Sequence, residues 1–258
     1  MDVKVELHGV PETLLWTLWH RAIEARRPDA VLDDPRAVEL VDAIDYPFAE
    51  RFGDGGPLAQ WQALRVLRFD IEVRRFLAAN PDGTVVALGE GLETQFWRVD
   101  NGRVRWLTVD VPESVAVRER LLPGGDRQIV VAGSALDERW MDAVDPSRGL
   151  LLTAQGLLMY FPFEDVLRLL AAAAERFRGS AFLFDAVPRR LSEASRRGRL
   201  GRRDGYQPPP WPWGLDRGHL RALAARVTAL DRLRLPPGRG AMRFIAPRLP
   251  RTILRALL

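Results

Sequence analysis

The chain has 258 residues, of which 47% are hydrophobic, so it can bury a full-sized core and is not a disordered protein. It has no cysteine and only three histidines, which excludes disulfides, thiolate zinc sites and cysteine nucleophiles, and we expect no metal centre. The net charge is +4, and the apolar stretch at 149–163 is too short to span a bilayer, so we expect a cytoplasmic protein without membrane contact.

Basic residues gather toward the C-terminus. Residues 189–258 hold 17 arginines against 4 acidic residues, and Lys4 is the only lysine of the chain. A basic segment can bind nucleic acid, but this one has no recognisable nucleic-acid-binding motif. The near-exclusive use of arginine is typical of a coding bias, so we expect no nucleic-acid partner.

The first eighty residues have helical patterning. Pro11 and Thr13 open a run whose apolar residues recur every three or four positions, and a second such run follows Asp34-Pro35. A glycine-rich loop then precedes a third helix at 58–79, which ends in a turn at 80–83. This part of the chain is predicted to form a helical cap.

The pattern then changes to short apolar runs separated by helical segments. Continuous apolar runs of this kind are typical of strands buried on both faces, and their alternation with helices predicts a parallel, doubly wound α/β sheet. The clearest intervening helix covers residues 164–177. The predicted strands are residues 84–88, 104–109, 128–132, 150–154, 181–184 and a last one at 241–245.

Residues 188–218 interrupt this alternation. The segment carries seven arginines at 189–204 and then a proline-rich stretch with Trp211 and Trp213, and its prolines exclude a central strand. It is either a lid packed over a substrate or a partly ordered surface linker. The two tryptophans favour the lid, because exposed tryptophan pairs are costly.

The most informative motif follows the first predicted strand. Gly89-Glu90-Gly91 comes directly after the strand, and Asp110 ends the next strand nineteen residues after Gly91. Glycines let the backbone approach a ligand closely, and a carboxylate at this place accepts hydrogen bonds from ribose hydroxyls. The arrangement predicts a nucleoside-binding site.

Acidic residues in the same loop indicate which nucleoside binds. A dinucleotide site has a third glycine where Thr94 stands, and a pyrophosphate needs a helix N-terminus free of negative charge, whereas Glu90 and Glu93 lie here. Two carboxylates suit a ligand with a sulfonium and an ammonium, so S-adenosylmethionine is favoured over NAD. The alternative is that both glutamates point to solvent.

A set of short motifs is shared with a known family. They are Gly9-Val10-Pro11-Glu12-Thr13, Arg21-Ala22-Ile23-Glu24, Asp34-Pro35-Arg36-Ala37, Arg65 with Asp70, Leu88–Thr94, Val109–Glu113 and Gln155–Tyr160. On these motifs, residues 9–187 resemble the leucine carboxyl methyltransferase family, in particular its bacterial branch of small-molecule and polyketide O-methyltransferases.

The resemblance implies a class I, Rossmann-like methyltransferase fold. This is a seven-stranded, mostly parallel sheet with an N-terminal helical addition and a lid insertion, and it would form one domain over residues 1–258. The implied parts are a helical cap at 1–80, a cofactor-binding core at 84–187, a lid at 188–218, and a last helix and strands at 219–258.

The resemblance also implies roles for single residues. Arg65 would pair with the carboxylate of the methionine moiety, which a guanidinium fork suits. Gly89 and Gly91 would line the methionine and the ribose, and Asp110 would hold the ribose hydroxyls.

Two positions depart from the family pattern. Ser134, next to Ala135, stands where the family has an aspartate at the adenine edge, and Asp137 would be a displaced replacement. Gln155 stands where the family has a glutamate facing the ligand ammonium, so we expect cofactor binding to be weaker by about 1–2 kcal/mol. Glu90 would offset part of this loss if it faced the same region.

Both departures still belong to the predicted cofactor site, with Ala135 beside them. Replacing Gln155 by glutamate would restore the family carboxylate and tighten binding. If a second buried acid lies next to Gln155, the new charge would instead be costly.

Residues predicted to meet the substrate lie after the strands and in the lid. Tyr160 follows the fourth strand, at the edge where open α/β sheets bind ligands, and would orient a substrate oxygen or form an aromatic wall. Trp211 and Trp213 would add apolar walls, and the arginines of the segment would attract an anionic acceptor. His219 is the other candidate for a catalytic role, or else a residue at a helix start, while His8 and His20 receive no role.

Together these features predict an S-adenosylmethionine-dependent O-methyltransferase that acts on a hydroxyl or carboxylate of a small metabolite. A carboxylate or acidic phenol needs no general base, whereas an alkyl hydroxyl does. Two alternatives stay open. Ser134 and Gln155 suggest a catalytically silent member that binds cofactor or a partner, and the third possibility is an NAD-dependent oxidoreductase, which Thr94 and the acidic loop disfavour. The acceptor and the oligomeric state are not predicted.

Overall fold

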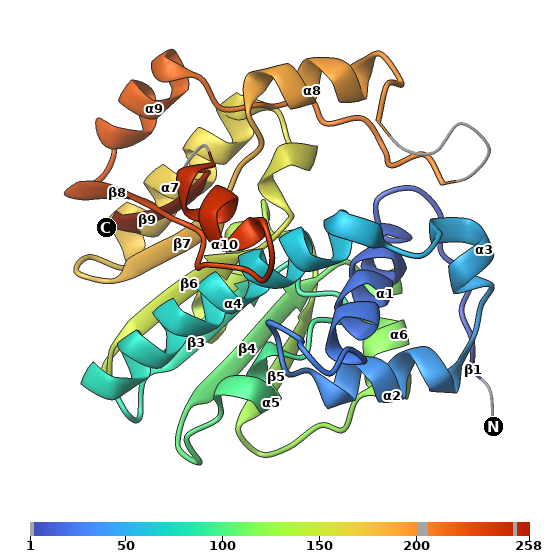
Figure 1. Ribbon diagram of the computed structural model, residues 1–258. Helices are drawn as coiled ribbons and strands as arrows, with labels where there is room; N and C mark the ends of the chain where they lie inside the picture. The colour runs from blue at the N-terminus through green and yellow to red at the C-terminus, as the bar shows by residue number, and fades with distance from the viewer. Residues whose placement is uncertain (1–2, 201–205, 250–251) are drawn as a thin grey trace.

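The computed structural model describes residues 3–200, 206–249 and 252–258. Its main sheet has seven strands in the order β5-β4-β3-β6-β7-β9-β8 (Figure 1). Strands β3 to β7 pair in parallel, and β9 is antiparallel to both of its neighbours, so the expected mostly parallel seven-stranded sheet is confirmed. The strands are β3 Thr84–Leu88, β4 Arg105–Asp110, β5 Gln128–Ala132, β6 Leu150–Ala154, β7 Ala181–Asp185, β8 Ala229–Leu233 and β9 Ile253–Leu257.

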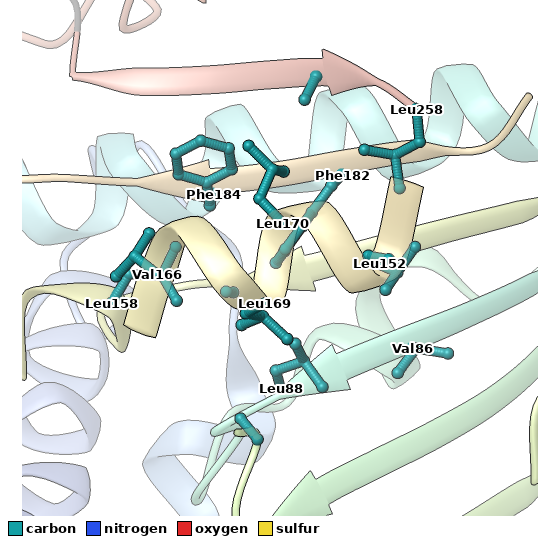
Figure 2. Close-up of a cluster of buried hydrophobic side chains, with 14 of the residues drawn as sticks. Val86, Leu88, Leu152, Leu158, Val166, Leu169, Leu170, Phe182, Phe184 and Leu258 are labelled. Carbon is teal, nitrogen blue, oxygen red and sulfur yellow. The ribbon is translucent and has the colours of Figure 1, made fainter. Parts of the chain in front are cut away.

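Side chains of the buried strands alternate between two helical layers. Val86 and Leu152 face α7 (Phe163–Arg176), whose apolar residues pack against them (Figure 2). Val85 and Leu151 lie on the other face with apolar residues of α4 (Gly56–Ala79), which crosses the front of the sheet in Figure 1. Because successive residues of a strand point to opposite faces, a run without polar interruption serves both layers.

The N-terminal helices form a second apolar cluster. It joins α1 (Thr13–Ala25), α2 (Pro35–Ala43) and α3 (Phe48–Phe52) to α6 (Pro112–Leu121) of the core. The two short strands β1 (Val3–Lys4) and β2 (Ile44–Asp45) pair in parallel beside them. Helix α1 buries the face that the sequence pattern predicts, which carries Leu14, Leu15, Leu18 and Ala22.

Segment 188–218 contains α8 (Arg189–Arg196) and an extended stretch from residue 206 onward, while residues 201–205 lie outside the described part of the chain. The Ser192 hydroxyl of α8 donates to the Trp211 carbonyl at 2.8 Å, and the Trp211 N–H donates to the Ser195 hydroxyl at 3.0 Å. Trp213 is only 2% exposed. The described parts of this segment are therefore packed against the molecule.

The strand predicted at 241–245 is wrong. These residues form the helical turn α10 (Met242–Ile245), and Phe244 is 63% exposed. The sheet is completed instead by β8, an edge strand that carries Asp231 and Arg232, and by β9. Exposed edge strands lack the continuous apolar run that marks buried ones, whereas residues 241–245 are mostly apolar, with Arg243 among them, and have no place in the sheet.

The remaining elements connect the layers. They are α5 (Gln95–Val99), α9 (Arg217–Ala224) and the 3₁₀ turns η1 (Glu138–Ala143), η2 (Leu158–Tyr160) and η3 (Ala246–Arg248). Within the described ranges, every helix is too short or too polar to cross a membrane.

Candidate functional site

A cavity of about 420 Å³ lies at the carboxyl ends of β3, β4 and β6. Ligands of open α/β sheets bind at this edge, and the volume is in the usual range for a small-molecule site. Helices α1 and α4 supply further walls through Thr13, Leu14 and Arg65. Among the residues that the structure describes, no cluster of three His, Asp or Glu side chains could hold a metal ion.

The structure brings the predicted cofactor residues together and separates the predicted substrate residues. Tyr160 lines the cavity, whereas Trp211, Trp213 and His219 are not among its lining residues. The predicted cofactor residues that line it are Arg65, Gly89, Glu90, Gly91, Asp110, Ser134, Ala135 and Gln155.

The glycine turn after β3 is shaped around Asp110. Gly89 and Gly91 have φ angles of +62° and +51°, and a Cβ on Gly91 would come within 2.9 Å of Leu14 Cβ. The Gly91 N–H donates to Asp110 Oδ2 at 2.7 Å, and the Val111 N–H donates to Oδ1 at 2.8 Å. Burial raises the pKa of Asp110, against the lowering effect of these two donors. The carboxylate is thus fixed at the cavity wall.

Glu90 is buried and paired. Its carboxylate accepts from Trp106 Nε1 at 3.1 Å and from the Thr108 hydroxyl, and Arg118 Nη2 lies 3.2 Å from Oε2. Burial raises the pKa of Glu90, and Arg118 opposes this effect. Its contacts fix the loop after β3.

Glu93 is also buried and paired. Its Oε1 lies 3.1 Å from Arg21 Nη1 and 2.8 Å from Arg98 Nη2. Burial alone would raise the pKa of Glu93, but the two arginines outweigh it and lower the value to about 2. The alternative that both glutamates face solvent is wrong, because Glu90 and Glu93 line the cavity and are paired with arginines.

One end of the cavity offers an unpaired donor and an unpaired acceptor. Arg65 Nη1 lies 3.0 Å from Asp185 Oδ2, and the Gly156 N–H donates to Asp185 Oδ1 at 2.6 Å. Arg65 Nε and Gln155 Oε1 are both buried without a hydrogen-bond partner. Buried polar atoms are normally paired, so this pair of atoms fits the carboxylate and the ammonium of an amino acid.

Asp185 was missed in the sequence. It ends β7 and orients both Arg65 and the turn after β6, although it lies 120 residues from Arg65 in the chain. Its place at the carboxyl end of a predicted strand was the available signal.

The opposite end of the cavity is formed by the loop after β5. Ser134 and Ala135 line it, and the Ser134 hydroxyl accepts from the Leu136 N–H at 3.2 Å. Asp137 does not replace the family aspartate, because its carboxylate pairs with Arg139 and caps η1. The side chain at this edge is therefore neutral.

The predicted substrate residues divide into two groups. Trp213 and His219 pack with each other and with Phe163 in the core, where Trp213 Nε1 lies 3.3 Å from His219 Nδ1. Trp211 lies against Tyr160, and its indole Nε1 is buried without a partner. Burial raises the pKa of the Tyr160 phenol.

Tyr206 is a second buried phenol that the sequence analysis did not single out. Its ring packs on Trp16 and Phe52, and its hydroxyl has no hydrogen-bond partner. Its position two residues before the prolines at 208–210 was the available signal.

Comparison with known proteins gives a consistent family. Residues 14–174 match the leucine carboxyl methyltransferase family. The chain is 34% identical over 231 residues to the tetracenomycin polyketide synthesis O-methyltransferase TcmP of Streptomyces glaucescens, which covers 89% of this chain and 83% of that protein. It is 28% identical to the S-adenosyl-L-methionine-dependent methyltransferase dpfgK of Gibberella zeae, over 69% of this chain and 64% of that protein.

A solved O-methyltransferase family protein from Burkholderia thailandensis is 18% identical, with a TM-score of 0.45 over 96% of this chain and 70% of that chain.

The sheet order and the cavity at its carboxyl edge define a class I methyltransferase. The chain belongs to the leucine carboxyl methyltransferase family, as its motifs predict, and it is an S-adenosylmethionine-dependent enzyme. The alternative of an NAD-dependent oxidoreductase is rejected.

Proposed function

We propose that this protein transfers a methyl group from S-adenosylmethionine to an oxygen atom of a small metabolite. The observation that carries the proposal is the cavity itself, which has an amino-acid-binding end at Arg65 and Gln155 and a fixed carboxylate at Asp110. A nucleoside joined to an amino acid needs these two ends. The name of TcmP, a polyketide O-methyltransferase, supports oxygen as the acceptor atom.

Each part of the cofactor has residues that suit it. Arg65 would bind the carboxylate, Gln155 would accept from the ammonium, and Asp110 would accept from the ribose hydroxyls. Ser134 and Ala135 would flank the adenine. The bound cofactor supplies a methyl group on a sulfonium, a good electrophile, so the protein has to align the acceptor oxygen and exclude water.

Tyr160 is placed to orient the acceptor. Burial raises the pKa of its phenol, so at neutral pH Tyr160 donates a hydrogen bond and does not remove a proton. Trp211 lies against the Tyr160 phenol and is not among the described residues that line the cavity, so it would support Tyr160 from outside the site. The nearby wall is mostly apolar and suits an apolar acceptor body, with Val10, Pro11, Leu14, Leu157 and Phe161.

The site favours acceptors that are acidic before they bind. No histidine is among the described lining residues. Of the four lining carboxylates, those of Glu90, Glu93 and Asp110 already hold hydrogen bonds, and Glu113 is an exposed side chain in the first turn of α6. A carboxylate or an acidic phenol needs no general base. We therefore propose such a group as the methyl acceptor.

Two measurements test the proposal. Calorimetry with S-adenosylhomocysteine should give one site per chain, and no binding would reject the cofactor assignment. Transfer of labelled methyl groups to a panel of aromatic carboxylic acids, phenols and alkyl alcohols should then favour the first two classes. Tight binding without transfer to any class would support the catalytically silent alternative.

A further inference from the structure

We propose that Glu93 is a positioning residue that fixes the amide of Gln155, so that Gln155 presents its carbonyl oxygen and not its NH2 group to the cofactor ammonium. The proposal rests on the cofactor site described above. It adds Glu93 as the residue that makes Gln155 a hydrogen-bond acceptor, and not a donor, toward the cofactor.

The geometry of the pair selects one orientation of the amide. Gln155 Nε2 donates to Glu93 Oε2 at 3.0 Å, and Gln155 Oε1 is left buried without a partner at the cavity wall. An ionised carboxylate only accepts hydrogen bonds, so it binds the NH2 end and turns the oxygen away. A free amide could present either end, and its NH2 group would repel an ammonium.

Arginines keep Glu93 ionised. The side chain is 12% exposed, and Arg21 of α1 and Arg98 of α5 both bind its Oε1. Arg21 and Arg98 also bind Asp34. The other charged groups around the pair are Asp70, Arg65, Asp185, Glu90 and Arg118.

The same geometry explains why this chain tolerates glutamine where the family pattern has glutamate. A carboxylate at position 155 would stand beside the carboxylate of Glu93, and two such groups at hydrogen-bond distance cannot both be ionised without a large cost. Gln155→Glu should therefore weaken cofactor binding. This reverses the expectation that restoring the family carboxylate tightens it.

Calorimetry with two ligands tests the proposal. S-adenosylhomocysteine carries the ammonium, and 5′-methylthioadenosine has the same nucleoside thioether without it. In the Gln155→Met variant, affinity for S-adenosylhomocysteine should fall about tenfold to a hundredfold, the range for a hydrogen bond to a charged group, while affinity for 5′-methylthioadenosine stays within about twofold.

Gln155→Glu adds a signature that a merely structural role would not give. At about pH 8 this variant should bind S-adenosylhomocysteine at least tenfold more weakly than the unchanged protein. At about pH 6 the two carboxyl groups at positions 93 and 155 should share a proton, which restores a donor toward Glu93, so most of the affinity returns. The unchanged protein should vary little between the two conditions.

Gln62→Glu is the matched control. Gln62 is a buried glutamine on α4 that is not among the cavity-lining residues, so its glutamate variant reports the general cost of a buried acid. Its affinity for either ligand should not change with pH.

The proposal is overturned if the Gln155→Glu variant binds S-adenosylhomocysteine as tightly as the unchanged protein does at about pH 8. Equal losses for both ligands in Gln155→Met would do the same, and they remain measurable if the glutamate variant does not fold. Failure of the unchanged protein to bind either ligand would instead reject the cofactor site.

Discussion

The arginines around this site differ in the carboxylates that they bind, and these partners indicate which arginine can meet a ligand. The chain has 38 basic residues, so an arginine alone carries little information. Arg21 and Arg98 are each bound to two or more buried carboxylates, which leaves them a structural role. Arg65 has Asp185 alone among the described ion pairs and keeps a buried Nε without a partner. Arg21, Arg68 and Arg118 also keep a buried nitrogen without a partner, but among the described residues Arg65 is the arginine that lines the cavity, so its free capacity is available to a ligand.

Arg65→Ala should weaken binding of S-adenosylhomocysteine at least tenfold, because a charge-assisted pair with the ligand carboxylate is lost. Arg68 is the matched control, since it lies three residues away on α4, pairs with Glu72 at 2.5 Å and does not line the cavity. Arg68→Ala should leave the affinity within about twofold. Calorimetry measures the affinity of both variants for S-adenosylhomocysteine, and equal losses of affinity would mean that Arg65 does not contact the ligand.

Asp110→Ala should weaken both S-adenosylhomocysteine and 5′-methylthioadenosine, each by about fivefold to a hundredfold. The ribose is common to the two ligands, and the Gly91 N–H also loses its acceptor. Arg65→Ala, in contrast, should spare 5′-methylthioadenosine. A variant of Asp110 that loses only the amino-acid-bearing ligand would show that the nucleoside lies elsewhere.

At the scale of elements, α8 and the stretch after residue 206 place two tryptophans in different settings. Trp211→Phe removes an N–H that has no partner within the described residues, so stability should change little. Because Trp211 lies against the Tyr160 phenol, which would orient the acceptor, KM for the acceptor should rise several-fold while cofactor affinity stays unchanged.

Trp213→Phe is the matched change in the same stretch. It removes the contact with His219 and trims a core side chain, so it should cost stability of about 1 kcal/mol or more without altering KM. Thermal unfolding and steady-state kinetics with an acceptor from the panel separate the two. If KM for the acceptor rises in Trp213→Phe and not in Trp211→Phe, the acceptor binds near Trp213, and its placement near Tyr160 is wrong.

The elements that can be predicted from the sequence are those whose local residue pattern reveals whether they are buried. The strands at 84–88, 128–132 and 150–154 have the predicted bounds. Edge strand β8 was missed, since its charged residues lie at an exposed margin where no apolar run is required.

The site residues likewise fall into those with a local sequence signal and those without one. Asp110 follows from its spacing to the glycine turn, whereas the Glu93–Gln155 and Arg65–Asp185 pairs join residues 62 and 120 positions apart. Such pairs arise only when separate elements, here helix α4, strand β7 and the loops after β3 and β6, meet at one edge of the sheet. No local pattern contains them, so they could not be derived from the sequence.

At the scale of the molecule, the cap and the core share the cofactor loop. Arg21 of α1 donates to the Leu92 carbonyl at 2.6 Å and to the Thr94 hydroxyl at 2.8 Å, so the N-terminal helices hold the turn that shapes the cavity. A ligand that bridges this turn and α4 should stabilise the whole fold.

S-adenosylhomocysteine at about a hundred times its Kd should add about 2.7 kcal/mol of stability, which raises Tm by roughly 5–10 °C for a chain of this size. NAD at the same concentration should leave Tm unchanged. Differential scanning calorimetry measures both, and an equal shift with NAD would reject the cofactor assignment.

The network around Glu93 also predicts how the fold responds to acid. The pKa of Glu93 is lowered from 4.5 to about 2, so its carboxylate stabilises the fold above the unfolded value and loses that contribution as pH falls through the folded one. Glu93→Gln keeps the shape of the side chain but removes the charge that Arg21 and Arg98 bind. The variant should therefore be less stable than the unchanged protein near neutral pH, and the difference in unfolding midpoint should shrink as pH falls from 4.5 toward 2. Urea unfolding followed by circular dichroism at a series of pH values measures this difference. A gap that stays constant across the interval would mean that Glu93 does not contribute through its charge.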